Sequence, residues 1–313
     1  MKTEKAHMRN REESLDPLKS PFLDLTRDYA FKIVMADPTK PELMMQLLNE
    51  LIPERDIVSI NFLNTEVLPD DEEYHRNNYD IQCTDRDGNC FIVEMQKEPY
   101  EHFRDRLMVY SGDPLKRLLK RGEAYDKVRT LYMVCILGGY LHIEGEDPSF
   151  RHELVRRAYV RIDKSNKILS DKLKYIFLQI PKAKEPTDGS SFLERWAYYV
   201  RTMGKVESKP VGLAPYFDRL FDAANRSNIE QGKLSIYDRM VRDEIQIEAE
   251  KQYAIKEALD DFSIRKEAEK QYAIKEALET KVCETARNMK TAGIAIELIS
   301  QCTGLTIEQV AEL

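Results

Sequence analysis

Residues 79–96 read YDIQCTDRDGNCFIVEMQ, and this stretch decides the fold. Its two ends, Tyr79 to Thr84 and Cys90 to Gln96, are rich in the residue types that favour strands. Between them, residues 85–89 (DRDGN) are types that tolerate the positive φ of a tight turn. The stretch therefore predicts a β-hairpin.

The segments around the hairpin alternate between helical and extended patterns. Residues 41–51 have apolar positions at helical spacing, and residues 57–67 are expected to form a strand. Residues 100–120 are expected to be helical, and the continuous apolar run LYMVCIL at 131–137 is typical of a strand buried on both faces. With a further short strand expected at 176–180, this order predicts an α/β fold with a mixed sheet flanked by helices.

From Ser190 onward we expect an all-helical C-terminal half. Residues 248–259 and 267–278 both read EAEKQYAIKEAL, at an offset of 19 residues. On a continuous helix this offset rotates the second copy by about 100°, so the copies form no single stripe and a solvated spacer helix is expected rather than a coiled coil. The end of the chain predicts helix, turn, helix, with a break at Gly304 and a capping box from Thr306 to Gln309.

These patterns divide the chain into five expected regions. They are a mobile N-terminal tail (1–21), an α/β domain (22–182), a helical region (183–240), a charged helix with the duplicated segment (241–281) and a helix-turn-helix-like tail (282–313).

Composition excludes several classes of protein. A hydrophobic fraction of 42% over 313 residues supports a packed core rather than wholesale disorder. No stretch approaches the roughly 18 to 20 apolar residues of a membrane span, so no membrane partner is expected. The charged first residues lack the apolar run of a secretory signal, and the five cysteines show no CxxC spacing. We therefore expect a reduced, cytoplasmic protein.

The formal net charge of −7 disfavours nucleic-acid binding for the chain as a whole, but positive charge is concentrated locally. Residues 104–129 hold eight bases against four acids, and residues 151–174 hold eight bases against three acids. Taken on charge alone, each cluster is interpreted as a solvated helix face.

The hairpin contains three polar residues that could take part in a reaction, namely Asp80, Glu94 and Gln96. Strand alternation places Glu94 and Gln96 on one face with Ile92, and the hairpin can bring Asp80 beside them. Two carboxylates at a strand end form an oxygen site of the kind that holds Mg²⁺ together with a substrate phosphate. Without further support, the polar face of an edge strand is the commoner explanation of a Glu and a Gln in this pattern, and the metal site is the rarer one.

Several segments together resemble one known family. Asp80 and the run Glu94-Met95-Gln96 resemble the acidic core of the PD-(D/E)XK nuclease superfamily, and more narrowly its recombination-promoting nuclease or PD-(D/E)XK family transposase branch. The run DYAFK at 28–32 resembles the N-terminal motif of that branch, and Arg106, Tyr110, Gly122, Tyr125 and the strand at 131–137 follow in its order. The resemblance covers residues 22–182 and, more loosely, 281–313, where TGLTIEQVAEL is similar to the terminal segment of the branch.

The resemblance implies a metal-dependent DNA endonuclease involved in recombination or transposition. Asp80 and Glu94 would bind Mg²⁺, or Mn²⁺ or Ca²⁺, with the backbone carbonyl of Met95 as a further ligand, and Gln96 would position the attacking water. A further acid often completes such sites. The candidates here are Asp28, Glu42, Glu50 and Glu66. Double-stranded DNA would be held by bases of the helix that follows, namely Arg104, Arg106 and Lys116.

Two departures from the family pattern keep an alternative open. Tyr79 replaces the usual Pro before the first acid, and Gln96 replaces the usual Lys. A neutral amide cannot offer positive charge to the reacting phosphate, although it can orient water by hydrogen bonds. The alternative is a non-catalytic DNA- or protein-binding relic of the nuclease fold. Oligomers could form through the C-terminal helices.

Overall fold

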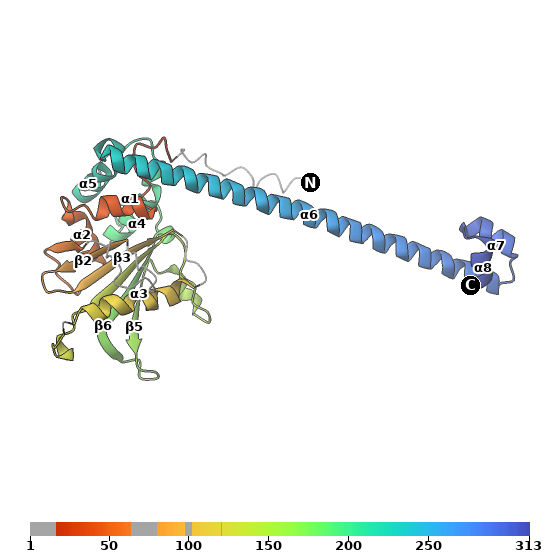
Figure 1. Ribbon diagram of the computed structural model, residues 1–313, viewed down its shortest axis with the longest axis horizontal. Coiled ribbons are helices and arrows are strands. Elements are labelled where there is room, and N and C mark those ends of the chain that lie inside the picture. Colours follow the sequence, from red (N-terminus) through yellow and green to blue (C-terminus); the bar gives the residue numbers. More distant parts are fainter. Residues whose placement is uncertain (1–16, 64–79, 98–101, 120) are drawn as a thin grey trace. The chain divides into compact units, whose positions relative to one another are not determined.

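The computed structural model describes residues 17–63, 80–97, 102–119 and 121–313. The chain forms two compact units that divide between Val241 and Arg242. The first unit contains one six-stranded mixed sheet with flanking helices (Figure 1). Its elements are α1 (Asp28–Met35), α2 (Pro41–Leu51), β1 (Ile60–Leu63), β2 (Ile81–Asp85), β3 (Cys90–Gln96), α3 (Phe103–Arg117), β4 (Leu131–Leu137), β5 (Val155–Arg161), β6 (Ile168–Gln179), α4 (Phe192–Thr202), α5 (Pro215–Ala224) and the beginning of α6 (Gln231–Thr291).

The sheet has the order β1-β2-β3-β4-β6-β5. β1, β2 and β3 are antiparallel, β4 lies parallel to both β3 and β6, and β5 pairs antiparallel with β6. The predicted hairpin of β2 and β3 is confirmed. Its turn contains Gly88 at φ +81°, and the Asp85 carboxylate accepts the backbone N–H groups of Asp87 and Asn89.

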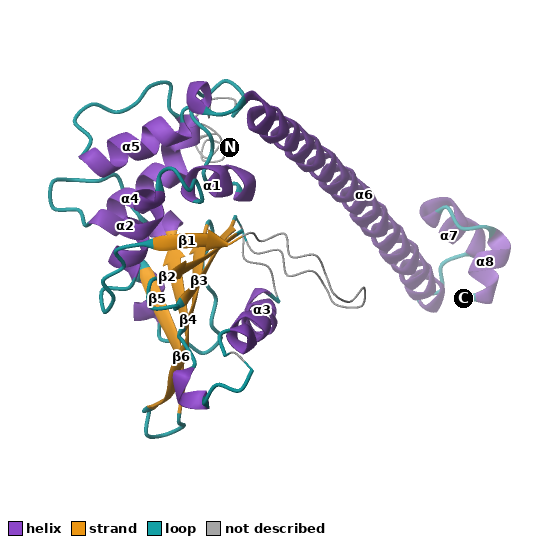
Figure 2. Ribbon diagram, turned by 60° about the vertical axis from the view of Figure 1, so that its left-hand side comes forward, coloured by secondary structure: helices purple, strands orange, loops and turns teal. Residues whose placement is uncertain are grey.

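Strand alternation builds a different core on each face of the sheet. On one face, Val93 and Met95 of β3 join the larger core with α1, α2, α4 and α5. On the other face, Ile92 of β3 packs with Phe103 and Leu107 of α3. Figure 2 shows α3 on the opposite side of the sheet from α2 and α4. β4 is buried along its whole length, as its continuous apolar run predicted.

The helical interpretation of residues 151–174 is wrong, because this segment forms β5 and most of β6. β5 is the last strand of the sheet, and the first half of β6 pairs only with β5, so much of this hairpin faces solvent. Basic side chains can therefore occupy it without any apolar alternation. The predicted strand at 176–180 is the buried C-terminal part of this longer β6.

The helical segment that follows the sheet packs on the same core. Trp196 of α4, Phe221 of α5 and Tyr237 of α6 are fully or almost fully buried there. The Tyr237 hydroxyl accepts the backbone N–H of Asp24. Residues 183–240, expected as a separate region, thus share a core with residues 22–182. The expected tail at 1–21 lies outside the described residues up to position 16.

The second unit consists of the remainder of α6 with α7 (Ile296–Thr303) and α8 (Ile307–Glu312). Both copies of the duplicated segment lie within α6, and all their residues are exposed. α7 and α8 pack on the end of α6 around Ala286, Ile299 and Val310. The predicted break at Gly304, at φ +77°, and the predicted capping box are both present. Among the described residues, no helix is long and apolar enough to cross a membrane.

Candidate active site

Asp80 and Glu94 lie opposite each other at the open end of the β2–β3 hairpin. Ile81 pairs with Val93, and one step further this register places Asp80 across from Glu94. The backbone N–H of Met95 donates to Oδ2 of Asp80 at 2.6 Å. The backbone N–H of Asp80 donates in turn to the Glu94 carboxylate. The hairpin backbone therefore holds the two carboxyl groups next to each other.

The two carboxyl groups are buried and interact strongly. Burial, together with the charge of Asp28, raises the pKa of Asp80 to about 7. Burial, together with the charge of Asp80, raises the pKa of Glu94 to about 8. Like charges at close range and loss of hydration both disfavour the ionised form. Near neutral pH the metal-free pair therefore retains protons that ordinary carboxyl groups would have lost.

Asp28 is the only one of the four candidate further acids that the described structure brings to this pair. It lies in the first turn of α1 and raises the pKa of both carboxyl groups, while burial raises its own pKa. Glu42 instead lies 4.0 Å from Arg219, and Glu50 is exposed on α2. Glu66 lies outside the described residues.

Positive charge reaches the site from two helices. Arg106 of α3 lowers the pKa of Asp28, Asp80 and Glu94, and its guanidinium lies 4.5 Å from the centre of the Tyr110 ring. Lys32 of α1 lowers the pKa of Asp80. From the sequence, Arg106 is expected to contact DNA phosphates alone, and Lys32 is not identified as a residue of the site. The signal for Lys32 was its spacing of four residues from Asp28, which places both on one face of a helix.

Gln96 ends β3 on the same face as Glu94 and is half-buried. Its backbone carbonyl accepts the N–H of Gly138 at 2.8 Å. A Cβ atom at Gly138 would lie only 2.3 Å from the carbonyl oxygen of Lys97. Glycine at this position therefore lets β4 pass close to the end of β3 that carries the site.

The other two predicted DNA contacts lie apart from the acids. Arg104 is exposed on α3 and lines a pocket beside β5 and β6. Lys116 is exposed in the last turn of α3. It lies ten residues after Arg106, or about 15 Å along the helix axis. Arg104 and Arg106 are two residues apart, or about 200° around the helix, so these bases do not share one face of α3.

The site fits a divalent cation through two acidic side chains. Oε1 of Glu94 is buried, and it has no hydrogen-bond partner in the described structure. An unsatisfied buried carboxylate oxygen next to a second carboxyl group is what a hard cation would satisfy. In the described part of the chain, no group of three His, Cys, Asp or Glu side chains is arranged to hold a metal ion. Asp28 affects the pair by raising the pKa of both carboxyl groups through its charge.

The chain is similar to a known protein family. Residues 25–258 match the family model described as PD-(D/E)XK nuclease family transposase. This range includes every described site residue discussed above. Neither a curated protein nor a solved structure matches the chain.

Proposed function

Since the chain belongs to the PD-(D/E)XK nuclease family transposases, we propose that it is a metal-dependent DNA endonuclease acting in recombination or transposition. The observation that carries the proposal is the buried pair of Asp80 and Glu94, whose Oε1 atom lacks a partner among the described residues. Replacing a buried acid pair by apolar residues would remove the free-energy cost of burying it. That the chain keeps a pair with such a cost is typical of a functional site rather than of a structural one.

Asp80 and Glu94 would hold Mg²⁺, or Mn²⁺ or Ca²⁺ in its place, with the carbonyl of Met95 as a further ligand. When bound, the ion would polarise the scissile phosphate and lower the pKa of a bound water. Its positive charge would also offset the repulsion that raises the pKa of both carboxyl groups.

In the family pattern one lysine supplies both positive charge and hydrogen bonds at the site. In this chain these tasks would be carried out by three residues, namely Arg106, Lys32 and Gln96. Arg106 and Lys32 place fixed positive charge beside the acids. Gln96 is neutral, and its amide can both donate to and accept from a water at the end of β3. We assign charge stabilisation to Arg106 and water positioning to Gln96. Arg104 and Lys116 would hold phosphates of double-stranded DNA, for which arginine is well suited.

The experiment that tests this proposal is nicking of supercoiled plasmid with Mg²⁺ or Mn²⁺ and with EDTA. The unmodified protein should nick in the presence of metal and stop with EDTA. Asp80→Ala and Glu94→Ala should each abolish nicking while circular dichroism shows a folded protein. Nicking that survives EDTA or either substitution would contradict the assignment.

The alternative is a relic of the fold that binds DNA or protein without cleaving it. The observation that favours it is Gln96, which leaves the position of the usual lysine without charge. Metal binding separates the two functions, because a nuclease needs both carboxylates to take up the ion. A relic would bind DNA without any dependence on Mn²⁺.

A further inference from the structure

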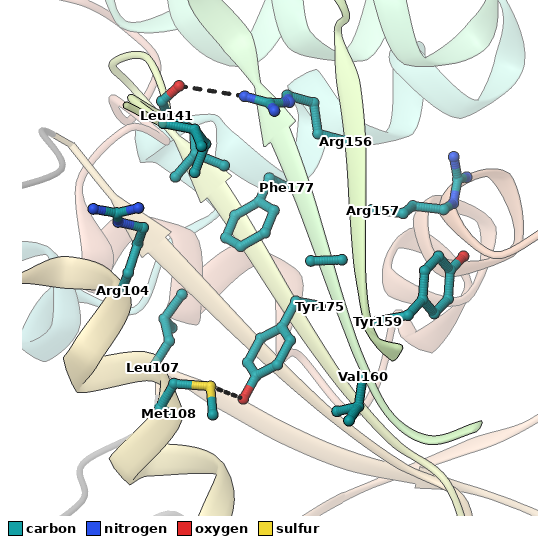
Figure 3. A pocket seen from close by; sticks show the side chains of 12 residues that line it. Arg104, Leu107, Met108, Leu141, Arg156, Arg157, Tyr159, Val160, Tyr175 and Phe177 are labelled. Atoms are coloured by element: carbon teal, nitrogen blue, oxygen red, sulfur yellow. Dashed lines mark hydrogen bonds between the residues drawn. The ribbon is translucent and has the colours of Figure 1, made fainter. Parts of the chain in front are cut away.

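A pocket of about 370 Å³ lies between α3 and the strands β5 and β6 (Figure 3). Phe177 and Tyr175 of β6 form its floor, and Leu107 and Met108 of α3 form one wall. Leu141 lies at one end. Its volume falls at the small end of the range of roughly 300–1,000 Å³ found for small-molecule sites. The lining is mostly apolar.

The pocket lies on the same face of the sheet as the acid pair. Across the sheet, Glu94 pairs with Cys135, Cys135 with Phe177, and Phe177 with Arg156. Directly paired residues point to the same face. Two strand spacings separate Glu94 from Phe177, which amounts to about 10 Å. Along one strand of stacked DNA, this distance corresponds to about three nucleotides.

Most polar groups of the pocket are already paired with other groups of the protein, whereas Arg104 at its edge makes no ion pair among the described residues. The Tyr175 hydroxyl bonds to Ser111 Oγ at 3.0 Å and to Met108 Sδ at 3.1 Å, so the ring is held in place. Arg156 is neutralised by Glu146 and also donates to the Leu141 carbonyl. Arg104 makes no ion pair within the described residues and is exposed at the edge of the pocket. Arg157 also lines the pocket but donates to the Leu51 carbonyl. A flat apolar group would find a rigid aromatic floor here, with Arg104 as a cation beside it.

We propose that this pocket takes an unstacked nucleobase of the DNA substrate, a few nucleotides from the phosphate that is cleaved. The inference rests on the proposed endonuclease function, which brings DNA to the acid pair. Phe177 and Tyr175 would contact the face of the base, and Arg104 would bind the adjoining phosphate. Extruded bases are held in this manner, between aromatic and apolar side chains.

A nucleobase suits the pocket better than a peptide side chain for two reasons. The pocket shares its sheet face and its covering helix with the acid pair, so the substrate itself passes beside it. In addition, the cation at its edge is Arg104, which lies on the same helix as Arg106 of the site, about 3 Å along the helix axis and on the other side of the helix. The protein should therefore prefer DNA with an unpaired nucleotide, because extruding a paired base costs a few kcal/mol more.

The test compares binding to a fluorescein-labelled duplex with one bulged nucleotide and to the fully paired duplex, by anisotropy at low salt with EDTA. The unmodified protein should bind the bulged duplex about tenfold or more tightly, within the range for stacking of one base. Ala158→Trp fills the pocket from an exposed position of β5 opposite Tyr175 and should remove the preference. Met108→Trp should do the same.

Val109→Trp is the matched control, because Val109 is the next residue of α3, is 70% exposed and does not line the pocket. It should keep the preference. Equal binding of both duplexes by the unmodified protein, or a preference that survives Ala158→Trp in a folded variant, would overturn the inference. Because binding is measured without metal, a bulge preference without any nicking activity would contradict only the proposed endonuclease. Nicking without a bulge preference would contradict only the nucleobase pocket.

Discussion

At the scale of residues, two buried carboxyl groups at one end of a hairpin cannot both ionise without cost. Asp80 and Glu94 resemble an acid pair that shares protons, and they titrate together rather than independently. The backbone N–H groups and Arg106 reduce this cost only in part, because the pKa of both groups remains raised. The residue-scale consequence is a stability that depends on pH and on metal.

The metal-free protein should lose stability as pH rises from about 5 to about 8. Below the unfolded-state pKa of about 4, the pair is protonated in both the folded and the unfolded state, so it does not change the free energy of unfolding with pH. Between that value and the folded pKa values of about 7 and about 8, the folded state binds more protons, so the free energy of unfolding falls with rising pH. Urea denaturation in EDTA at several pH values measures this. Glu94→Gln should flatten the profile, and an unmodified protein that gains stability from pH 5 to 8 would contradict it.

Gln96 gives the second residue-scale prediction. If it only positions water, Gln96→Lys should keep or raise the cleavage rate, because lysine adds the usual positive charge. Gln96→Ala should lower the rate by about 10²- to 10⁴-fold, the span typical of one positioning or proton-transfer group. Single-turnover rates measure both effects. Equal rates for all three proteins would make Gln96 a structural residue.

At the scale of elements, the strands with a continuous apolar pattern could be predicted from the sequence with their bounds. The edge strand β1 (Ile60–Leu63) lies within the longer strand predicted at 57–67, whereas the other edge strand, β5, was not predicted. β3 and β4 match their predicted bounds because they are buried on both faces. β5 was missed because its exposed position allows basic residues at most sites. The proximity of Asp80 and Glu94 could be predicted, because it follows from the register of the hairpin. The proximity of Asp28 and Lys32 to this pair could not, because it depends on how α1 packs on the sheet.

The close passage of β4 beside β3 provides an element-scale prediction. Gly138→Ala would place a methyl group 2.3 Å from the Lys97 backbone, and one strand end must move. We expect destabilisation by about 1 to 3 kcal/mol, as for other overpacked sites, together with loss of cleavage because Gln96 shifts. Thermal denaturation and nicking assays measure both.

Gly112→Ala is the control for this change. Gly112 lies within α3, and a Cβ atom there would meet nothing within 4 Å. Alanine should stabilise the helix by about 0.5–1 kcal/mol, because glycine is a poorer helix former. Similar destabilisation by both substitutions would mean that the β3–β4 contact has no special role.

At the scale of the whole molecule, the distribution of charge decides where DNA can bind. The net charge is −7, yet bases follow the site along α3. In the second unit, residues 242–281 hold eleven acids against eight bases, and residues 292–313 contain Glu297, Glu308 and Glu312 but no Lys or Arg. The helix-turn-helix-like tail (282–313) therefore offers DNA only Arg287 and Lys290, both at the end of α6, and the Lys290 amine donates to backbone carbonyls of α8. Oligomer formation through the C-terminal helices stays a prediction.

DNA affinity should fall steeply with salt, with a log–log slope of about −0.9 per phosphate contact. Arg104→Glu with Lys116→Glu should weaken binding to all sequences and flatten this slope. Deletion of residues 260–278, which removes one repeat period of α6, should leave the slope unchanged. Anisotropy over a salt series measures the slope. An unchanged slope after the charge reversals would place DNA elsewhere, with the basic strands β5 and β6 next to be tested.

The central claim is that Asp80 and Glu94 form one metal site, and calorimetric titration with Mn²⁺ at pH 7 tests it most directly. At this pH the two carboxyl groups still hold protons because their pKa values are raised, and the ion must displace these protons when it binds. On the order of one proton should therefore be released per ion. This release is measured as a binding heat that changes with the ionisation enthalpy of the buffer. Asp80→Ala and Glu94→Ala should each abolish this binding. Absence of Mn²⁺ binding in the unmodified protein, or binding that persists unchanged in both variants, would contradict the claim.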